Sequence, residues 1–245
     1  MELLFQPRYR LLDGGLVALQ ASAAYTRSRA LRRQPQGREI RDIGRDSAML
    51  REACRLAMGY RTDKPLMLSL QITEAQAASG LLAQLIAEVL CISGLHPERM
   101  ELEFSEGSLQ ADENDMLYLL AALRDLGVGL VLGGFGSGVS SLTLLRRRSL
   151  AGLLSGLKLD QLLVRDVVGE DRDIGFLRGL AESAHALGLL VLAEGVESEL
   201  HHDRLLEAGC DQGLGTWLGD AEPAAEYVAR PHRTLRDPAD AISFG

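Results

Sequence analysis

The stretch that decides the fold is Val128-Gly-Leu-Val-Leu-Gly-Gly-Phe-Gly-Ser-Gly-Val-Ser-Ser-Leu142. Its first part, Val128 to Leu132, is apolar and β-prone, which predicts a buried strand. A helix is predicted to resume near Ser140. Between the strand and the helix we expect a glycine-rich loop: Gly133, Gly134, Gly136 and Gly138. Such loops hold the chemistry of α/β proteins, but this one contains no carboxylate, His or Lys.

Strand and helix patterns alternate on both sides of this stretch. Strands are predicted at Leu3–Leu12, Leu16–Ala23, Leu66–Ile72, Met100–Phe104, Leu153–Leu159 and Leu189–Ala193, with a last apolar segment at Cys210–Leu218. Helices are predicted at Asp46–Tyr60, Ser79–Ile92, Asp112–Leu126, Asp171–Leu187 and Glu199–Ala208. Because no Pro/Gly/Ser linker divides them, we expect a single α/β domain over residues 1–230, a TIM-like (βα)8-type barrel, followed by a tail over residues 231–245.

Composition narrows the classes of function. The chain has 245 residues, 47% of them hydrophobic, and a net charge of -8, which argues against a general nucleic-acid binder. Its three cysteines are unclustered, so they predict neither a disulfide framework nor a zinc site, and a reducing cytoplasm is the expected setting. The first residues do not resemble a signal peptide, and no apolar run is long enough to span a membrane.

In a barrel of this kind the active site lies at the carboxyl ends of the strands. The candidates at these positions include acids, amides and one lysine: Gln20, Gln71, Glu103, Gly133, Gly134, Lys158, Asp160, Glu194, Glu197 and Leu214.

Several motifs at these strand ends resemble a known family. They are Phe5-Gln-Pro7, Glu103-Phe-Ser-Glu106, Gly133 to Leu142, Leu157-Lys-Leu-Asp160, Ala193-Glu-Gly-Val-Glu197 and Gly209-Cys-Asp211. In this order they are similar to the motifs of the EAL-domain cyclic di-GMP phosphodiesterases, over residues Leu4 to Tyr227. The resemblance implies a modified TIM barrel with one antiparallel strand. It also implies hydrolysis of one phosphodiester bond of cyclic di-GMP with Mg²⁺ or Mn²⁺ held by oxygen ligands.

The chain departs from the family pattern at most positions that the resemblance assigns to metal or phosphate. The signature Glu-Ala-Leu is replaced by Gln20-Ala-Ser22, and the Arg that follows it in the family by Ala24. Further replacements are Gln71 for the Asn ligand, Gly133 and Gly134 for the Asp pair, and Leu214 for the late Gln. A two-residue deletion would instead match the late Gln with Gln212. Three positions agree with the family: Glu103, Lys158 and Glu194.

These replacements remove three anionic oxygen donors, at positions 20, 133 and 134. Hard divalent cations depend on such donors, so we expect no metal, no cofactor and no useful phosphodiesterase activity. The predicted function is that of a catalytically inactive EAL-like domain in cyclic di-GMP-related bacterial signalling, acting through a protein partner of a signalling or motility pathway. A homodimer is left open.

Two alternatives stay open. The first is a metal-independent receptor for cyclic di-GMP, since some inactive family members keep ligand binding; its contacts would come from Gln20, Glu103, Lys158, Asp160, Glu194 and Glu197. The second is an active phosphodiesterase with Mg²⁺ or Mn²⁺. Two single residues also have two interpretations each. Glu103 is either a surviving metal ligand or the ion-pair partner of Lys158, and we favour the ion pair. Lys158 either contacts a ligand phosphate or forms that ion pair with Glu103.

Overall fold

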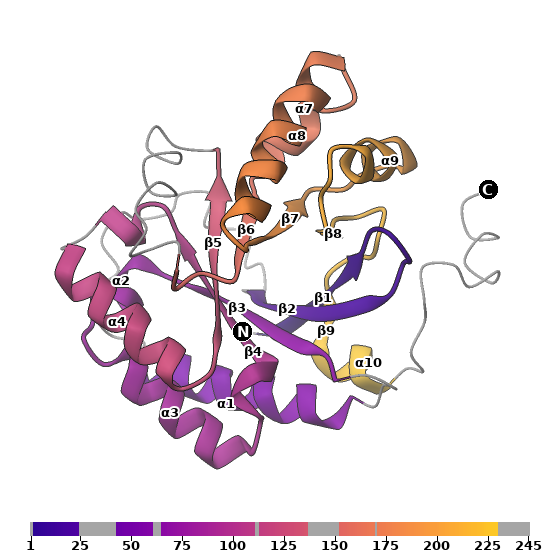
Figure 1. Cartoon of the computed structure of the whole chain (residues 1–245). Coiled ribbons are helices and arrows are strands. Elements are labelled where there is room, and N and C mark those ends of the chain that lie inside the picture. Colours follow the sequence, from indigo (N-terminus) through magenta and orange to yellow (C-terminus); the bar gives the residue numbers. More distant parts are fainter. Residues whose placement is uncertain are drawn as a thin grey trace, which may run out of the picture.

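The computed structural model describes residues 2–24, 43–60, 65–110, 113–136, 152–169 and 171–229. In these residues eight strands close into a mixed barrel surrounded by helices, and a short ninth strand pairs with the first (Figure 1). The strand order is β2-β3-β4-β5-β6-β7-β8-β1, with β1 also paired to β2. The predicted TIM-like barrel in a single domain is therefore confirmed.

The two strands predicted at the start of the chain form a hairpin. Strand β1 (Glu2–Arg10) pairs antiparallel with β2 (Leu16–Ala24), and also with β8 (Gln212–Leu214), which closes the ring. Gly14 occupies the turn with φ 68°, a left-handed conformation that glycine adopts without strain. Strand β1 is thus the single antiparallel member of the ring that the family resemblance implies.

The other strands of the ring run parallel to one another. They are β3 (Met67–Ile72), β4 (Met100–Ser105), β5 (Gly129–Phe135), β6 (Gly156–Leu159) and β7 (Leu190–Glu194), and the short β9 is Glu222–Pro223. The helices are α1 (Ile43–Gly59), α2 (Glu74–Ala77), α3 (Leu82–Ser93), α4 (Glu113–Asp125), α7 (Gln161–Asp166), α8 (Asp171–Ala186), α9 (Glu199–Glu207) and α10 (Ala224–Ala229).

The predicted boundary of the glycine loop is wrong. Strand β5 continues to Phe135, so Gly133 and Gly134 are strand residues. Gly133 pairs with Ser105 of β4, and Phe135 pairs with Leu159 of β6 after an irregularity in register. Because Phe135 is almost completely buried, packing extends the strand past the glycines that suggested its end. The predicted helix near Ser140, Gly138 and the tail over residues 231–245 lie outside the described residues.

Smaller differences concern short elements. Strand β6 begins at Gly156, later than the predicted start at Leu153. The four-residue helix α2 and the six-residue helix α7 have too few residues to show a helical period in the sequence. In both, the residue before the helix caps it: Thr73 accepts from the Gln76 amide, and Asp160 accepts from the Leu162 amide.

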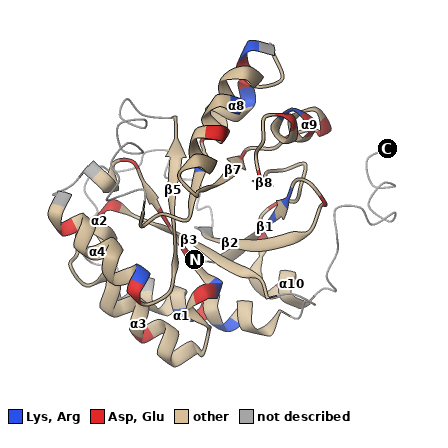
Figure 2. Ribbon diagram, in the orientation of Figure 1, with Lys and Arg blue, Asp and Glu red and all other residues tan. Residues whose placement is uncertain are grey.

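Charged residues on the outer helices carry both signs. Figure 2 shows acidic and basic residues interspersed along α1 and α8. In the part of the chain that the structure describes, no helix combines the length and apolar character needed to cross a bilayer.

The barrel interior is unusual because it contains ionised side chains. Successive residues of a strand point to opposite faces, so Leu102 and Phe104 of β4 face the helices while Glu101 and Glu103 face inward. Glu101 accepts two hydrogen bonds from the Arg8 guanidinium of β1, at 2.6 and 2.9 Å, and one from the Ser69 hydroxyl of β3, at 2.8 Å. Arg8 and Glu101 are only 2% and 7% exposed.

The Arg8–Glu101 pair fixes the ionisation of Glu101. Burial by itself would raise the pKa of Glu101, but the charge of Arg8 and the hydrogen bonds from Arg8 and Ser69 outweigh it. The pKa is therefore held below its ordinary value of 4.5. A carboxyl group with a lowered folded-state pKa stabilises the fold above its unfolded pKa, and this contribution is lost as the pH falls through the folded-state value.

We predict that Arg8→Leu reverses this pH dependence. The substitution leaves a buried carboxylate without its counter-charge, which should cost about 3–5 kcal/mol of the free energy of unfolding at neutral pH. Glu101 would then have a raised pKa, so stability should decrease as the pH rises above about 4.5. Urea unfolding at several pH values measures both effects. The double variant Arg8→Leu/Glu101→Leu should recover most of the stability, and an Arg8→Leu protein with the wild-type pH slope would contradict the prediction.

Candidate functional site at the carboxyl end of the barrel

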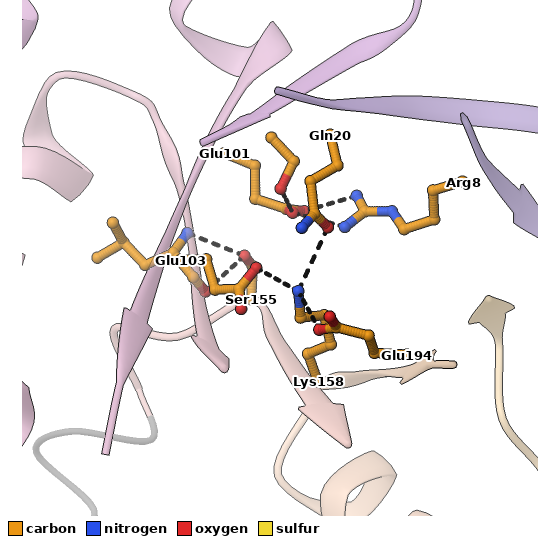
Figure 3. Close-up of polar contacts among 9 residues, drawn as sticks. Arg8, Gln20, Glu101, Glu103, Ser155, Lys158 and Glu194 are labelled. Atoms are coloured by element: carbon orange, nitrogen blue, oxygen red, sulfur yellow. Dashed lines mark hydrogen bonds and ion pairs between the residues drawn. The ribbon is translucent and has the colours of Figure 1, made fainter. Parts of the chain in front are cut away.

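The carboxyl ends of four strands bring together the residues on which the candidate site depends. Lys158 of β6 points its ammonium group at three oxygen atoms from β2, β4 and β7 (Figure 3). The distances from Nζ are 2.6 Å to Glu103 Oε2, 2.8 Å to Glu194 Oε2 and 3.3 Å to Gln20 Oε1. A lysine ammonium has three N–H donors, so these three oxygens satisfy it completely.

Burial differs among the members of this cluster. Lys158 is 1% exposed and Glu103 is 3% exposed, so this ion pair is shielded from water. The side chain of Glu194 is 42% exposed, and its charge is therefore partly solvated. The interpretation of Glu103 as the ion-pair partner of Lys158 agrees with this geometry. The sequence analysis gave Glu194 only as a ligand contact in the receptor alternative, and the structure adds its ion pair with Lys158.

Both buried partners have shifted pKa values. Burial opposes the charge on Lys158, but the carboxylates of Glu103 and Glu194 outweigh it and raise the lysine pKa above 10.5. Burial raises the pKa of Glu103, although the charge of Lys158 acts against that shift. The ammonium is therefore charged at neutral pH, and it is the cation around which the carboxylates of this site are arranged.

Gly133 explains how Glu103 reaches its position. A Cβ atom added at Gly133 would lie 2.6 Å from Glu103 Cγ and 2.7 Å from Cδ, far inside van der Waals contact. The Glu103 side chain thus occupies the space that any side chain at position 133 would need. Gly134 has φ 66°, a backbone conformation that side-chain-bearing residues rarely adopt. The two glycines change the shape of the site as well as removing acids from it.

The remaining candidates do not join the cluster. Asp160 caps α7, since its Oδ1 accepts from the Leu162 amide at 2.8 Å. Gln71 is exposed at the end of β3, and Glu197 is exposed in the loop after β7. Leu214 is buried beside Glu194, with which it is paired in register.

The two candidates for the late position lie at different levels of β8. Strand β8 places Leu214 beside Glu194 at the carboxyl end of the barrel, whereas Gln212 pairs with Leu192, two residues nearer the amino end. Leu214 therefore stands in the place that the ungapped motif assigns to it. An apolar side chain there cannot donate a hydrogen bond to a ligand.

Sequence reasoning gave no role to Glu106, the last residue of the Glu103-Phe-Ser-Glu106 motif. Its side chain is buried, and Oε1 accepts from the Gly136 amide at 3.2 Å. This contact ties the end of β5 to the loop after β4. The sequence offered one indication of this role. Glu106 is an acid three residues after Glu103, so it follows the end of the strand closely and can reach the loop of a neighbouring strand.

Among the described residues, no group of three or more His, Cys, Asp or Glu side chains is arranged to hold a metal ion. The acidic side chains around Lys158 are Glu103 and Glu194, and both contact the ammonium.

Comparison with known proteins identifies relatives among the cyclic di-GMP phosphodiesterases. The chain is 32% identical over 165 residues to the cyclic di-GMP phosphodiesterase RocR of Pseudomonas aeruginosa, a match covering 67% of this chain and 41% of RocR. It is 28% identical to the bifunctional diguanylate cyclase/cyclic di-GMP phosphodiesterase MucR of the same species, covering 66% of this chain and 23% of MucR. The chain thus spans less than half the length of these relatives.

A solved structure and a family model agree with these relatives. The crystal structure of the EAL domain of Mycobacterium smegmatis DcpA superposes with a TM-score of 0.77 at 25% identity, covering 94% of each chain. The family model described as "EAL domain" matches residues 1–221. The chain therefore belongs to the EAL domain family, which is related to the cyclic di-GMP phosphodiesterases.

Proposed function

We propose that this EAL domain is catalytically inactive and acts in cyclic di-GMP-related bacterial signalling by binding another protein. One observation carries the proposal: the acids that meet the Lys158 ammonium are Glu103 and Glu194, while position 20 supplies an amide oxygen and positions 133 and 134 are glycines. In the resemblance stated above, position 20 belongs to an acidic metal ligand, and Glu103 and Glu194 are positions that agree with the family. The Lys158 ammonium, a cation that belongs to the chain itself, therefore lies among these oxygens.

A divalent ion does not fit this arrangement. Mg²⁺ requires near-octahedral oxygen coordination, and Mn²⁺ is likewise bound by oxygen donors. Here Glu103 and Glu194 are the acidic donors, and their carboxylates bind Lys158. Gly133 provides no side-chain oxygen, and the space beside it is filled by Glu103. A metal ion would have to displace an ammonium held by two charge-assisted contacts while standing close to its positive charge.

Binding of cyclic di-GMP is less favoured than in a typical member of the family. The lysine is buried, and its three donors are already satisfied. Ala24 and Leu214 replace two polar side chains that the family uses at this end. The receptor alternative is therefore ranked second, and the active phosphodiesterase last.

We predict that the purified domain does not convert cyclic di-GMP into its linear form with either Mg²⁺ or Mn²⁺. Without a held metal no water is activated, so turnover should stay at the background rate of buffer. Chromatography of the reaction products measures this, with the RocR phosphodiesterase as the positive control. Calorimetry with cyclic di-GMP in the same buffers separates the alternatives: micromolar binding without turnover would favour the receptor, and turnover would refute the proposal.

We further predict that Lys158→Met creates sensitivity to Mn²⁺ that the wild-type domain lacks. The substitution leaves Glu103 and Glu194 without their cation, which should reduce the free energy of unfolding by about 3–5 kcal/mol. Added Mn²⁺ should restore part of this loss, because a bound ion stabilises the folded state. Thermal unfolding with and without Mn²⁺ measures the effect.

The matched control for this prediction is Lys158→Met/Glu103→Gln, which removes the charge of one carboxylate and should show no response to Mn²⁺. If wild-type protein already gains as much stability from Mn²⁺ as the lysine variant, the ammonium is not the cation of the site.

A further inference from the structure

A methionine in the last turn of α1 contacts an arginine from a distant part of the chain. The sulfur of Met58 accepts a hydrogen bond from Arg99 Nη1 at 3.6 Å. The same guanidinium donates from Nε to the carbonyl oxygen of Leu66 at 3.0 Å. Leu66 directly precedes β3, and Arg99 directly precedes β4. Arg99 therefore joins the end of α1 to the beginning of two barrel strands.

The contact between the sulfur and the guanidinium is weak and leaves donors unused. A thioether is a poor hydrogen-bond acceptor, whereas a guanidinium carries five N–H donors in a fixed plane. Among the described residues, the partners of Arg99 are held by Nε and Nη1, and Nη2 has none. Unused donors of a permanent cation therefore lie beside the Met58 sulfur.

Met58 is also the methionine that solvent reaches most easily among the described residues. Its side chain belongs to the exposed surface, and the residue is 44% exposed. Met100 and Met116 are 0% and 5% exposed, and Met49 and Met67 are half-buried. An oxidant dissolved in water therefore meets the sulfur of Met58 before it meets the others.

We infer that Met58 is an oxidation site whose sulfoxide is bound by Arg99. The oxidant is a hydroperoxide, and hydrogen peroxide is the simplest one. The sulfur attacks one peroxide oxygen, so an S–O bond forms while the O–O bond breaks. The departing hydroxide takes the proton of the transferred oxygen and leaves as water. The sulfur loses two electrons, and the peroxide gains them.

Oxidation changes the strength of the contact with Arg99. A sulfoxide oxygen carries partial negative charge and accepts hydrogen bonds well, and a bond from a guanidinium to such an oxygen is assisted by charge. Methionine oxidation usually disrupts a protein because it places a polar group in an apolar core. Met58 is outside the core, so its sulfoxide gains a partner without that cost. The oxidised residue should hold the end of α1 more firmly against the barrel.

The inference goes beyond the proposed function and is tested separately from it. None of its residues belongs to the cluster around Lys158, so the outcome is the same whether or not the domain hydrolyses cyclic di-GMP.

The first experiment locates the oxidation. The full chain is treated briefly with hydrogen peroxide and digested, and its peptides are analysed by mass spectrometry. Met58 should be oxidised at least about fivefold faster than Met49 and Met67, because exposure governs access of the oxidant. Met100 and Met116 should stay reduced. Oxidation of Met58 at the rate of the half-buried methionines, or more slowly, would overturn the inference.

The second experiment measures the contact with Arg99. In a Met49→Leu/Met67→Leu background, peroxide treatment should raise the midpoint of thermal unfolding by roughly 1–3 °C, as expected for one charge-assisted hydrogen bond in a domain of this size. Adding Met58→Leu to this background should remove the response. Reduction by methionine sulfoxide reductase should restore the original midpoint.

Arginine variants in the same background identify the partner. Arg99→Leu removes the donors, so oxidation should no longer raise the midpoint. Arg99→Gln, which keeps a polar side chain but not the charge, replaces this variant if the leucine protein fails to fold. Arg178→Gln is the matched control, since Arg178 pairs with Glu207 of α9, and it should keep the full response. A midpoint that does not rise in the background protein, or that rises equally in the Arg99 variants, would show that Arg99 does not bind the sulfoxide.

Discussion

The interior of this barrel depends on one constraint: every charge enclosed by the strands must meet an opposite charge within the ring. A buried charge without a partner is far more costly than the pair itself. Arg8 of β1 meets Glu101 of β4, and Lys158 of β6 meets Glu103 of β4 and Glu194 of β7. The contacts of Arg8 with Glu101 and of Lys158 with Glu103 join strands that are not neighbours in the sheet, whereas β6 and β7 are adjacent. They therefore specify which residues of β4 face inward, because a shift of one residue would turn both acids toward the helices.

Glycines, which have no side chain, shape both ends of the barrel interior as much as the charges do. At the carboxyl end, Gly133 leaves room that Glu103 takes, and this brings the carboxylate to Lys158. At the amino end, Gly129 lines a cavity and a Cβ atom there would make only ordinary contacts, the nearest at 3.4 Å, whereas the side chains of Leu192 and Val131 approach Gly156. The difference has a physical cause. Glu103 has a long side chain and a cation to reach, whereas the residues around Gly129 include the short side chain of Ser155, whose hydroxyl is engaged with the backbone of Leu130.

Much of the fold was predictable, because apolar periodicity marks every long strand and helix and because the motifs occur in the order of a known family. The end of β5 was not, since glycine usually signals a loop and only the burial of Phe135 and the pairing of Gly133 with β4 reveal the strand. Within the site, Glu103 and Lys158 could be matched as partners from their strand ends. The role of Glu194 as a second partner, the capping role of Asp160 and the cavity at Gly129 depend on three-dimensional packing that no local pattern encodes.

The charges at the carboxyl end of the barrel do not balance one another completely. One ammonium faces two carboxylates, and the surplus negative charge falls on Glu194, whose side chain is 42% exposed to water. Water can therefore stabilise the part of this negative charge that Lys158 does not neutralise. A further buried carboxylate at position 20 or 133 would be shielded from water and would require an additional cation. The amide of Gln20 and the absence of a side chain at Gly133 therefore suit the single positive charge of Lys158. Together they keep the negative charge of the site at a level that one lysine and the surrounding water can neutralise.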